Sequence, residues 1–202
     1  MQLADPLLER ILAAVVAWQA GAADAAAGLA VLVPAAERGD ALHRCLLAHF
    51  LAEAQPDPAQ ELSWDLRALQ VADELSDARL RAWQPTLSVA AFRPSLLLNV
   101  AASYRKVGDV AMARATVAQA QAASLVLADD GYGRLIRGGI ARIAQDLAGC
   151  ARKRPRRLGL TGQGALPIIR PTRDRTGAVA QLGERDVRNV EVRGSIPLGS
   201  TN

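Results

Sequence analysis

The chain has 202 residues with 50% hydrophobic and only 3% aromatic content, which allows one compact domain with a core of small and aliphatic side chains. Its two cysteines exclude a disulfide-stapled scaffold and fit a cytoplasmic protein, and we expect neither a signal peptide nor a membrane span. The net charge of +4 is no evidence for nucleic-acid binding, because residues 1–150 carry 13 basic and 16 acidic side chains, whereas residues 151–202 carry 11 basic and 4 acidic ones.

Abundant alanine and helical spacing of apolar residues predict an all-α domain over residues 1–149. Asp5 before Pro6 and Asp57 before Pro58 are typical of an N-cap followed by a proline in the first turn. We expect breaks at Gly21, at Pro34 and at Gly108, and we expect Pro94 to open a new helix. The predicted helices cover residues 5–19, 23–33, 41–54, 58–75, 78–92 (with Pro85 at a start or kink), 94–107, 110–124 and about 132–148.

Two of these helices have a clear apolar stripe. In helix 58–75, Leu62, Leu66 and Leu69 form one apolar stripe. A second stripe consists of Trp64, Ala68, Val71 and Leu75. The exposed face is predicted to hold Glu61, Asp65, Arg67, Asp73 and Glu74. In the last helix, the buried side is predicted to hold Leu135, Ile136, Ile140, Ile143 and Leu147.

The stretch "DDGYGRLIRGG" before and within the last helix is not a phosphate-binding loop, because it lacks a Lys-Ser/Thr ending and follows no strand. We interpret Asp129 or Asp130 as the helix cap and the pair Gly138–Gly139 as the place of a close helix contact.

Residues 94–127 resemble one tetratricopeptide repeat, a helical hairpin of roughly 34 residues. Small side chains stand where the two helices would approach, and larger ones fill the gaps beside them. The matching positions are Leu97, Val100, Ala101, Tyr104, Gly108, Ala113, Val117 and Ala120. Residues 6–33 and 41–75 match only as generic helical hairpins.

The stretches "HRCLLAHFLAE", "ELSWDLRAL" and "LVLADDGYGRLIRGGIARI" are similar to an uncharacterised group of bacterial tetratricopeptide-like proteins. The resemblance implies a fold and no activity.

A ligand site is suggested by the same resemblance. Some tetratricopeptide domains use an asparagine five residues before the tyrosine to hold a peptide's terminal carboxylate, and Asn99 stands at that place. The lysines of the family's carboxylate clamp are replaced here by Leu98 and Ala102, so the charge would have to come from Arg134 and Arg137. The candidate peptide-binding residues are Asn99, Arg105, Lys106, Arg134 and Arg137; the alternative is that Asn99 only bridges two helices.

Cys45, His49 and Glu53 share one helix face and are the alternative site, for a metal or for enzymatic chemistry. A closed zinc site needs four ligands, and no second pair has recognisable spacing. Packing is therefore the preferred interpretation, with no cofactor and no metal.

Residues 150–202 are predicted to be a disordered basic tail. The stretch "CARKRPRRLG" is basic but has no aromatic residue for base stacking, so a nucleic-acid partner is not expected. Within 177–201, "AVAQLGER" and "GSIP" resemble the translation of the D-arm and T-arm of a bacterial transfer-RNA gene. That resemblance implies that the reading frame continues into a neighbouring transfer-RNA gene.

The sequence therefore predicts a non-enzymatic adaptor or scaffold that binds a protein or peptide through successive helical hairpins. Neither the partner nor the pathway follows from the residues.

Overall fold

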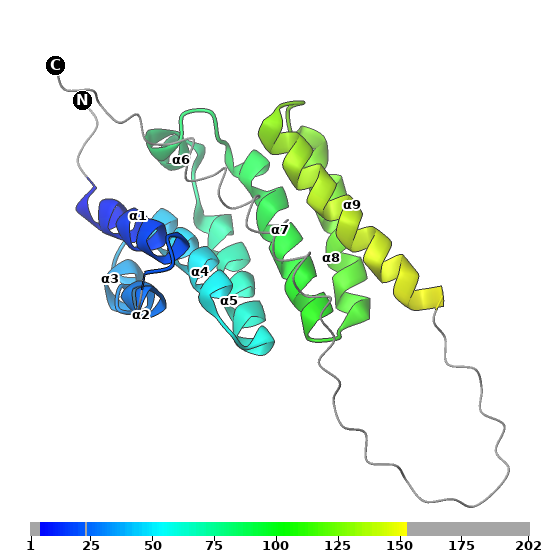
Figure 1. The fold of residues 1–202 in the computed structure, drawn as a ribbon. Coiled ribbons are helices and arrows are strands. Elements are labelled where there is room, and N and C mark those ends of the chain that lie inside the picture. Colours follow the sequence, from blue (N-terminus) through cyan, green and yellow to red (C-terminus); the bar gives the residue numbers. More distant parts are fainter. Residues whose placement is uncertain (1–4, 23, 153–202) are drawn as a thin grey trace, which may run out of the picture.

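The computed structural model describes residues 5–22 and 24–152, and this part of the chain is all-α, as predicted. Helices α7, α8 and α9 lie together at one end of the molecule, and α1 to α3 lie at the other end (Figure 1). The predicted tail lies outside the described residues from 153 onward. The elements are α1 Pro6–Gln19, α2 Ala25–Ala30, α3 Val33–Glu37, α4 Ala41–Ala54, α5 Pro58–Val71, η1 Ala72–Glu74, α6 Asp77–Trp83, α7 Val89–Lys106, α8 Val110–Ala123, η2 Ser124–Val126 and α9 Gly131–Arg152.

Short polar side chains begin most of the longer helices. The carboxylate of Asp5 accepts a hydrogen bond from the backbone N–H of Leu8 at 3.0 Å, and that of Asp57 accepts one from Ala59 at 3.1 Å. Both predicted N-caps are therefore confirmed, each with a proline in the first helical turn.

The predicted helix 23–33 is shorter in the structure. α2 ends at Ala30, and a separate short helix, α3, begins at Val33. Pro34 is the second residue of α3 rather than a break, because the N–H that proline lacks has no intrahelical partner in a first turn.

The predicted helix 78–92 is also wrong. α6 ends at Trp83, and α7 begins at Val89 after a connection that contains Pro85. The reason is Ser88, whose hydroxyl accepts a hydrogen bond from the backbone N–H of Ala91 at 3.1 Å and so starts α7 there. Pro94 consequently lies inside α7 instead of opening a helix, and its lost backbone hydrogen bond is outweighed by the burial of almost every residue from Phe92 to Ser103.

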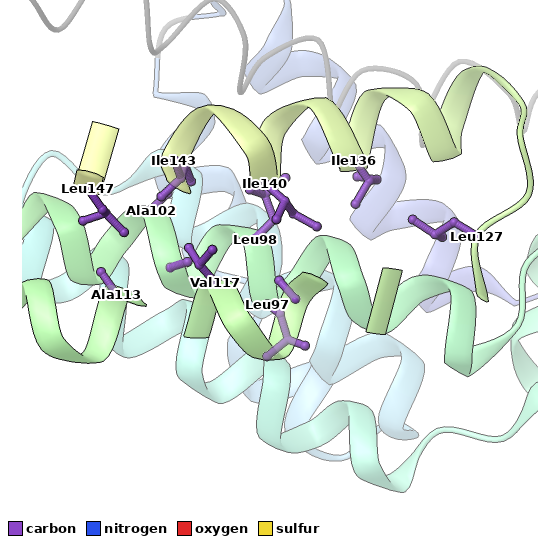
Figure 2. Close-up of a cluster of buried hydrophobic side chains, with 12 residues drawn as sticks. Leu97, Leu98, Ala102, Ala113, Val117, Leu127, Ile136, Ile140, Ile143 and Leu147 are labelled. Carbon is purple, nitrogen blue, oxygen red and sulfur yellow. The ribbon is translucent and has the colours of Figure 1, made fainter. Parts of the chain in front are cut away.

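The hairpin α7–α8 and the last helix share one hydrophobic cluster (Figure 2). Ala101, Ala113 and Ala120 have no exposed surface, and Gly108 makes the turn between the helices at a φ of +85°. Leu97, Val100 and Val117 are buried, and Tyr104 is half-buried. α9 covers this hairpin with Ile136, Ile140, Ile143 and Leu147 as predicted, while Leu135 is only half-buried.

The two glycines of α9 differ in their surroundings. A Cβ on Gly139 would lie 2.7 Å from Cδ2 of Leu98, so α9 and α7 are in close contact here and a larger residue would require the Leu98 side chain to shift. A Cβ on Gly138 would meet nothing within 4 Å. The prediction of a close helix contact is confirmed for Gly139 and wrong for Gly138.

The core face predicted for α5 is partly wrong. Glu61 and Asp65 are 7% and 2% exposed, whereas Leu66 is 38% exposed. The two acids face α7, where Lys106 and Ser103 offer them hydrogen bonds, so the buried side of α5 is polar at this point. Apolar periodicity alone could not indicate this face.

Candidate functional site

A cavity of about 350 Å³ lies where the connection between α6 and α7 meets the connection between η2 and α9. Its size is at the lower end of the range of small-molecule and side-chain pockets. Two aromatic residues, a group of apolar ones and several polar ones form its wall: Trp83, Gln84, Thr86, Leu87, Ser88, Ala91, Val126, Leu127, Ala128, Asp130 and Tyr132.

The aromatic residues come from two helix ends. Trp83 is the last residue of α6, and its indole Nε1 is buried with no hydrogen-bond partner in the described part of the chain. Tyr132 lies in the first turn of α9, and its hydroxyl donates to the carbonyl oxygen of Ala91 at 3.4 Å. A buried donor without a partner costs stability in a protein without a ligand, and such groups call for a specific explanation.

The second connection is held against α9 by Arg137. Its guanidinium donates to the carbonyl oxygens of Leu127 at 3.1 Å and of Ala128 at 3.2 Å. Gly133 is needed beside it, because a Cβ at that position would clash with the carbonyl oxygen of Ala128. Arg137 and Gly133 therefore position this wall of the cavity.

The adjacent carboxylates Asp129 and Asp130 have different surroundings. Asp129 is paired with Arg134 at 3.3 Å and with Arg137 at 3.4 Å. Asp130 caps α9 by accepting a hydrogen bond from the backbone N–H of Gly133 at 2.7 Å, and within residues 5–22 and 24–152 it has no ion-pair partner. The predicted cap is thus Asp130, and its negative charge belongs to the cavity wall.

Two neighbouring apolar residues of η2 are exposed, and one of them lines the cavity. Val126 lines the cavity and is 58% exposed. Its sequence neighbour Leu125 is 85% exposed, the highest value among the large hydrophobic residues of the described part of the chain. In Figure 2, Leu127 marks the end of the hydrophobic cluster nearest to the start of α9. The cavity therefore opens beside an apolar surface that residues 5–22 and 24–152 leave uncovered.

The five peptide-binding residues predicted from the sequence do not form one group. Arg134 and Arg137 lie beside the cavity, as described above. Arg105 and Lys106 lie at the opposite end of α7, where Arg105 pairs with Asp146 at 3.3 Å and Lys106 pairs with Glu61 at 2.8 Å.

Asn99 is only 4% exposed, and its Nδ2 lies 3.2 Å from Nδ1 of His49. It is the middle member of a buried polar row on α7 that also contains Ser95 and Ser103. Ser103 donates to Asp65 at 2.6 Å, so this row joins α7 to α4 and α5. This geometry corresponds to the alternative in which Asn99 bridges two helices.

Cys45, His49 and Glu53 are not gathered into a metal site. Cys45 is fully buried, and its thiol lies 3.4 Å from the carbonyl oxygen of Ala68. The ring of His49 packs edge-on against Phe50 and Phe92. Within residues 5–22 and 24–152, no group of three or more histidine, cysteine, aspartate and glutamate side chains is arranged to hold a metal ion.

A second polar cluster joins α1, α4 and α6. Nε2 of His43 lies 2.9 Å from Asp5, while its Nδ1 accepts the backbone N–H of Asp40 at 3.1 Å. Arg79 forms ion pairs with the carboxylates of Asp5 and Asp40. Because both ring nitrogens are engaged in this way, His43 is not placed to act as a general base.

The same contacts set the charge states of the cluster. Partial burial acts to raise the pKa of Asp5, but hydrogen bonds from Leu8, His43 and Arg79 hold it below its ordinary value. Burial likewise opposes the lowering of the pKa of Asp40, which results mainly from the hydrogen bond with Arg79. The cluster is an electrostatic clamp between helices.

Sequence analysis missed Trp83, Leu87 and Tyr132. Tyr132 stands in the stretch "DDGYGRLIRGG", whose acids and glycines account for a helix cap and a close helix contact without involving the tyrosine. Nothing in the sequence relates this tyrosine to Trp83, because the two residues belong to helices that meet only in the tertiary fold.

Comparisons with family models, with curated proteins and with solved structures find no match to this chain. Over the described residues, no helix has the length and apolarity needed to cross a membrane. The cavity and its surroundings are therefore the features of the structure that bear on function.

Proposed function

We propose that this chain is a non-enzymatic adaptor that binds a protein or peptide partner. One side chain of the partner would occupy the cavity lined by Trp83, Tyr132 and Leu127. The observation that carries the proposal is the combination of this cavity with the exposed apolar residue Val126 in its wall and the exposed Leu125 next to it in the sequence. A pocket for one anchor residue beside an apolar rim is a common design of peptide-binding surfaces.

The unpaired indole N–H of Trp83 supports the proposal. Tryptophan and tyrosine are enriched where partners dock, because they combine a large apolar surface with a polar group. The fold adds a second argument, since helical hairpins stacked side by side leave extended surfaces for partners.

A non-enzymatic role is favoured by the chemistry of the wall. The cavity is lined by one carboxylate and by no histidine, cysteine or lysine. A serine or threonine nucleophile is commonly activated by an adjacent general base, and the wall offers no histidine or lysine for that role. Binding is the simpler use of such a site.

The experiment is a peptide-display selection against the full chain, followed by affinity measurements on the selected peptides. We expect Tyr132→Ala and Val126→Asp to weaken binding by about tenfold or more, as for the central residues of an interface. Met112→Ala is the matched control, because Met112 is also an exposed apolar residue, 43% exposed, but lies at the start of α8.

Selected peptides that bind the Tyr132 and Val126 variants as tightly as the wild type would refute the cavity as the binding site. Failure to select any binding peptide would count against the adaptor function itself.

A further inference from the structure

We infer that the cavity is specific for a lysine side chain of the partner. The inference rests on the proposed function and names the chemistry of the anchor residue. It follows from three features of the wall: an exposed carboxylate that has no cationic side-chain partner among the described residues, two aromatic rings and an apolar surface.

The carboxylate is Asp130. Its neighbour Asp129 is neutralised by Arg134 and Arg137, whereas Asp130 has no cationic partner in residues 5–22 and 24–152. It is also the only charged side chain among the residues that line the cavity. A cationic group of a ligand would complete this charge.

The aromatic rings favour the same kind of ligand. Trp83 and Tyr132 both line the cavity, and the faces of such rings attract an ammonium group. The combination of tryptophan, tyrosine and one carboxylate around a small cavity is the chemistry by which proteins bind amines.

The apolar residues accommodate the rest of a lysine. Leu87, Ala91 and Leu127 offer aliphatic surface on which a stem of four methylene groups can pack, while the charged end reaches Asp130.

Lysine is preferred over arginine because of the cap. One carboxylate oxygen of Asp130, Oδ1, already accepts the backbone N–H of Gly133 at 2.7 Å. A bidentate contact with a guanidinium would have to share this oxygen with the cap, whereas an ammonium group can bind the other oxygen alone.

The test uses two blocked pentapeptides with the full chain, acetyl-Ala-Ala-Lys-Ala-Ala-amide and the same peptide with norleucine in place of lysine. Binding is followed through the NMR signal of the Trp83 indole N–H, which is assigned by its loss in Trp83→Phe. We expect the lysine peptide to bind about fivefold more tightly than the norleucine peptide.

Asp130→Asn keeps a capping side chain and removes the charge, so it should abolish this preference. Asp129→Asn is the matched control and should leave it unchanged. In the wild type, 1 M sodium chloride should reduce the preference, which gives a readout that needs no variant.

Equal binding of both peptides would overturn the inference and leave the proposed function standing. If neither peptide shifts the Trp83 signal, although display-selected peptides bind, the inference also fails. If no peptide of any kind binds, the inference and the proposed function fail together.

Discussion

The packing of α9 on α7 can be tested by adding one methyl group at each of two adjacent glycines. Alanine is about 1 kcal/mol more favourable than glycine inside a helix. At Gly138, where a Cβ would meet nothing within 4 Å, the substitution should therefore raise the free energy of unfolding by about 0.5–1 kcal/mol. At Gly139 the new Cβ would lie 2.7 Å from Cδ2 of Leu98.

Leu98 cannot move away easily, because it is 5% exposed and belongs to the cluster with Ile136, Ile140 and Ile143. Overpacking of this kind costs about 1–3 kcal/mol, which cancels or exceeds the gain in helix propensity. We expect Gly139→Ala to range from no net change to a loss of about 2 kcal/mol.

The two variants are to be compared by urea unfolding and by thermal melting of the full chain. One kcal/mol corresponds to a shift in Tm of about 2–4 °C for a domain of this size. If Gly139→Ala stabilised the protein as much as Gly138→Ala does, α9 would not lie against Leu98 as described. The cavity would then lose the support for the wall that carries Asp130 and Tyr132.

Three further predictions follow from the polar contacts. Asn99→Ala should lower the free energy of unfolding by about 1–3 kcal/mol, because it removes a buried partner of His49. The same substitution should leave the affinity of display-selected peptides unchanged. Weaker binding without a loss of stability would instead favour the carboxylate-clamp hypothesis. Arg137→Met should lower the free energy of unfolding by about 1 kcal/mol, because it releases the carbonyl groups of Leu127 and Ala128. It should also weaken peptide binding, which fluorescence titration of the variant and the wild type measures. Arg79→Met should cost about 1–2 kcal/mol at pH 7 in urea unfolding. Because the pKa values of Asp5 and Asp40 are lowered in the folded protein, their contribution to stability is present above the unfolded pKa of 3.8 and is lost as pH falls through the folded values. The Arg79→Met variant should therefore lose less stability than the wild type below about pH 4. Equal pH dependence of the two proteins would contradict the clamp.

Local signals in the sequence predicted much of the fold. Asp5 with Pro6 and Asp57 with Pro58 begin helices where their capping chemistry indicates. The isoleucines of α9 are buried as their spacing predicts, because an amphipathic last helix has only one neighbouring surface to cover. The tetratricopeptide resemblance of residues 94–127 stays a prediction.

The errors occur where tertiary contacts override local preference. Pro94 is tolerated inside α7 because that helix is packed on several sides, and Ser88, not the proline, decides where it begins. Glu61 and Asp65 are buried because α7 presents Lys106 and Ser103 to them, which a helical wheel of α5 alone does not contain.

The candidate site could be predicted only in part. Asp130 was recognised as a possible cap and Arg137 as a possible ligand-binding residue, but the structure relates both of them to a cavity instead of a carboxylate clamp. The cavity itself depends on the meeting of two loops, and no spacing along the chain encodes that meeting.

The most direct test of the proposed function is an amide chemical-shift map of the full chain with a display-selected peptide. The account predicts that the largest changes fall in residues 83–91 and 126–132, together with the indole N–H of Trp83. Largest changes in the separate hollow of α4 and α5 that Arg44, Arg67 and Gln70 help to line would contradict this proposal.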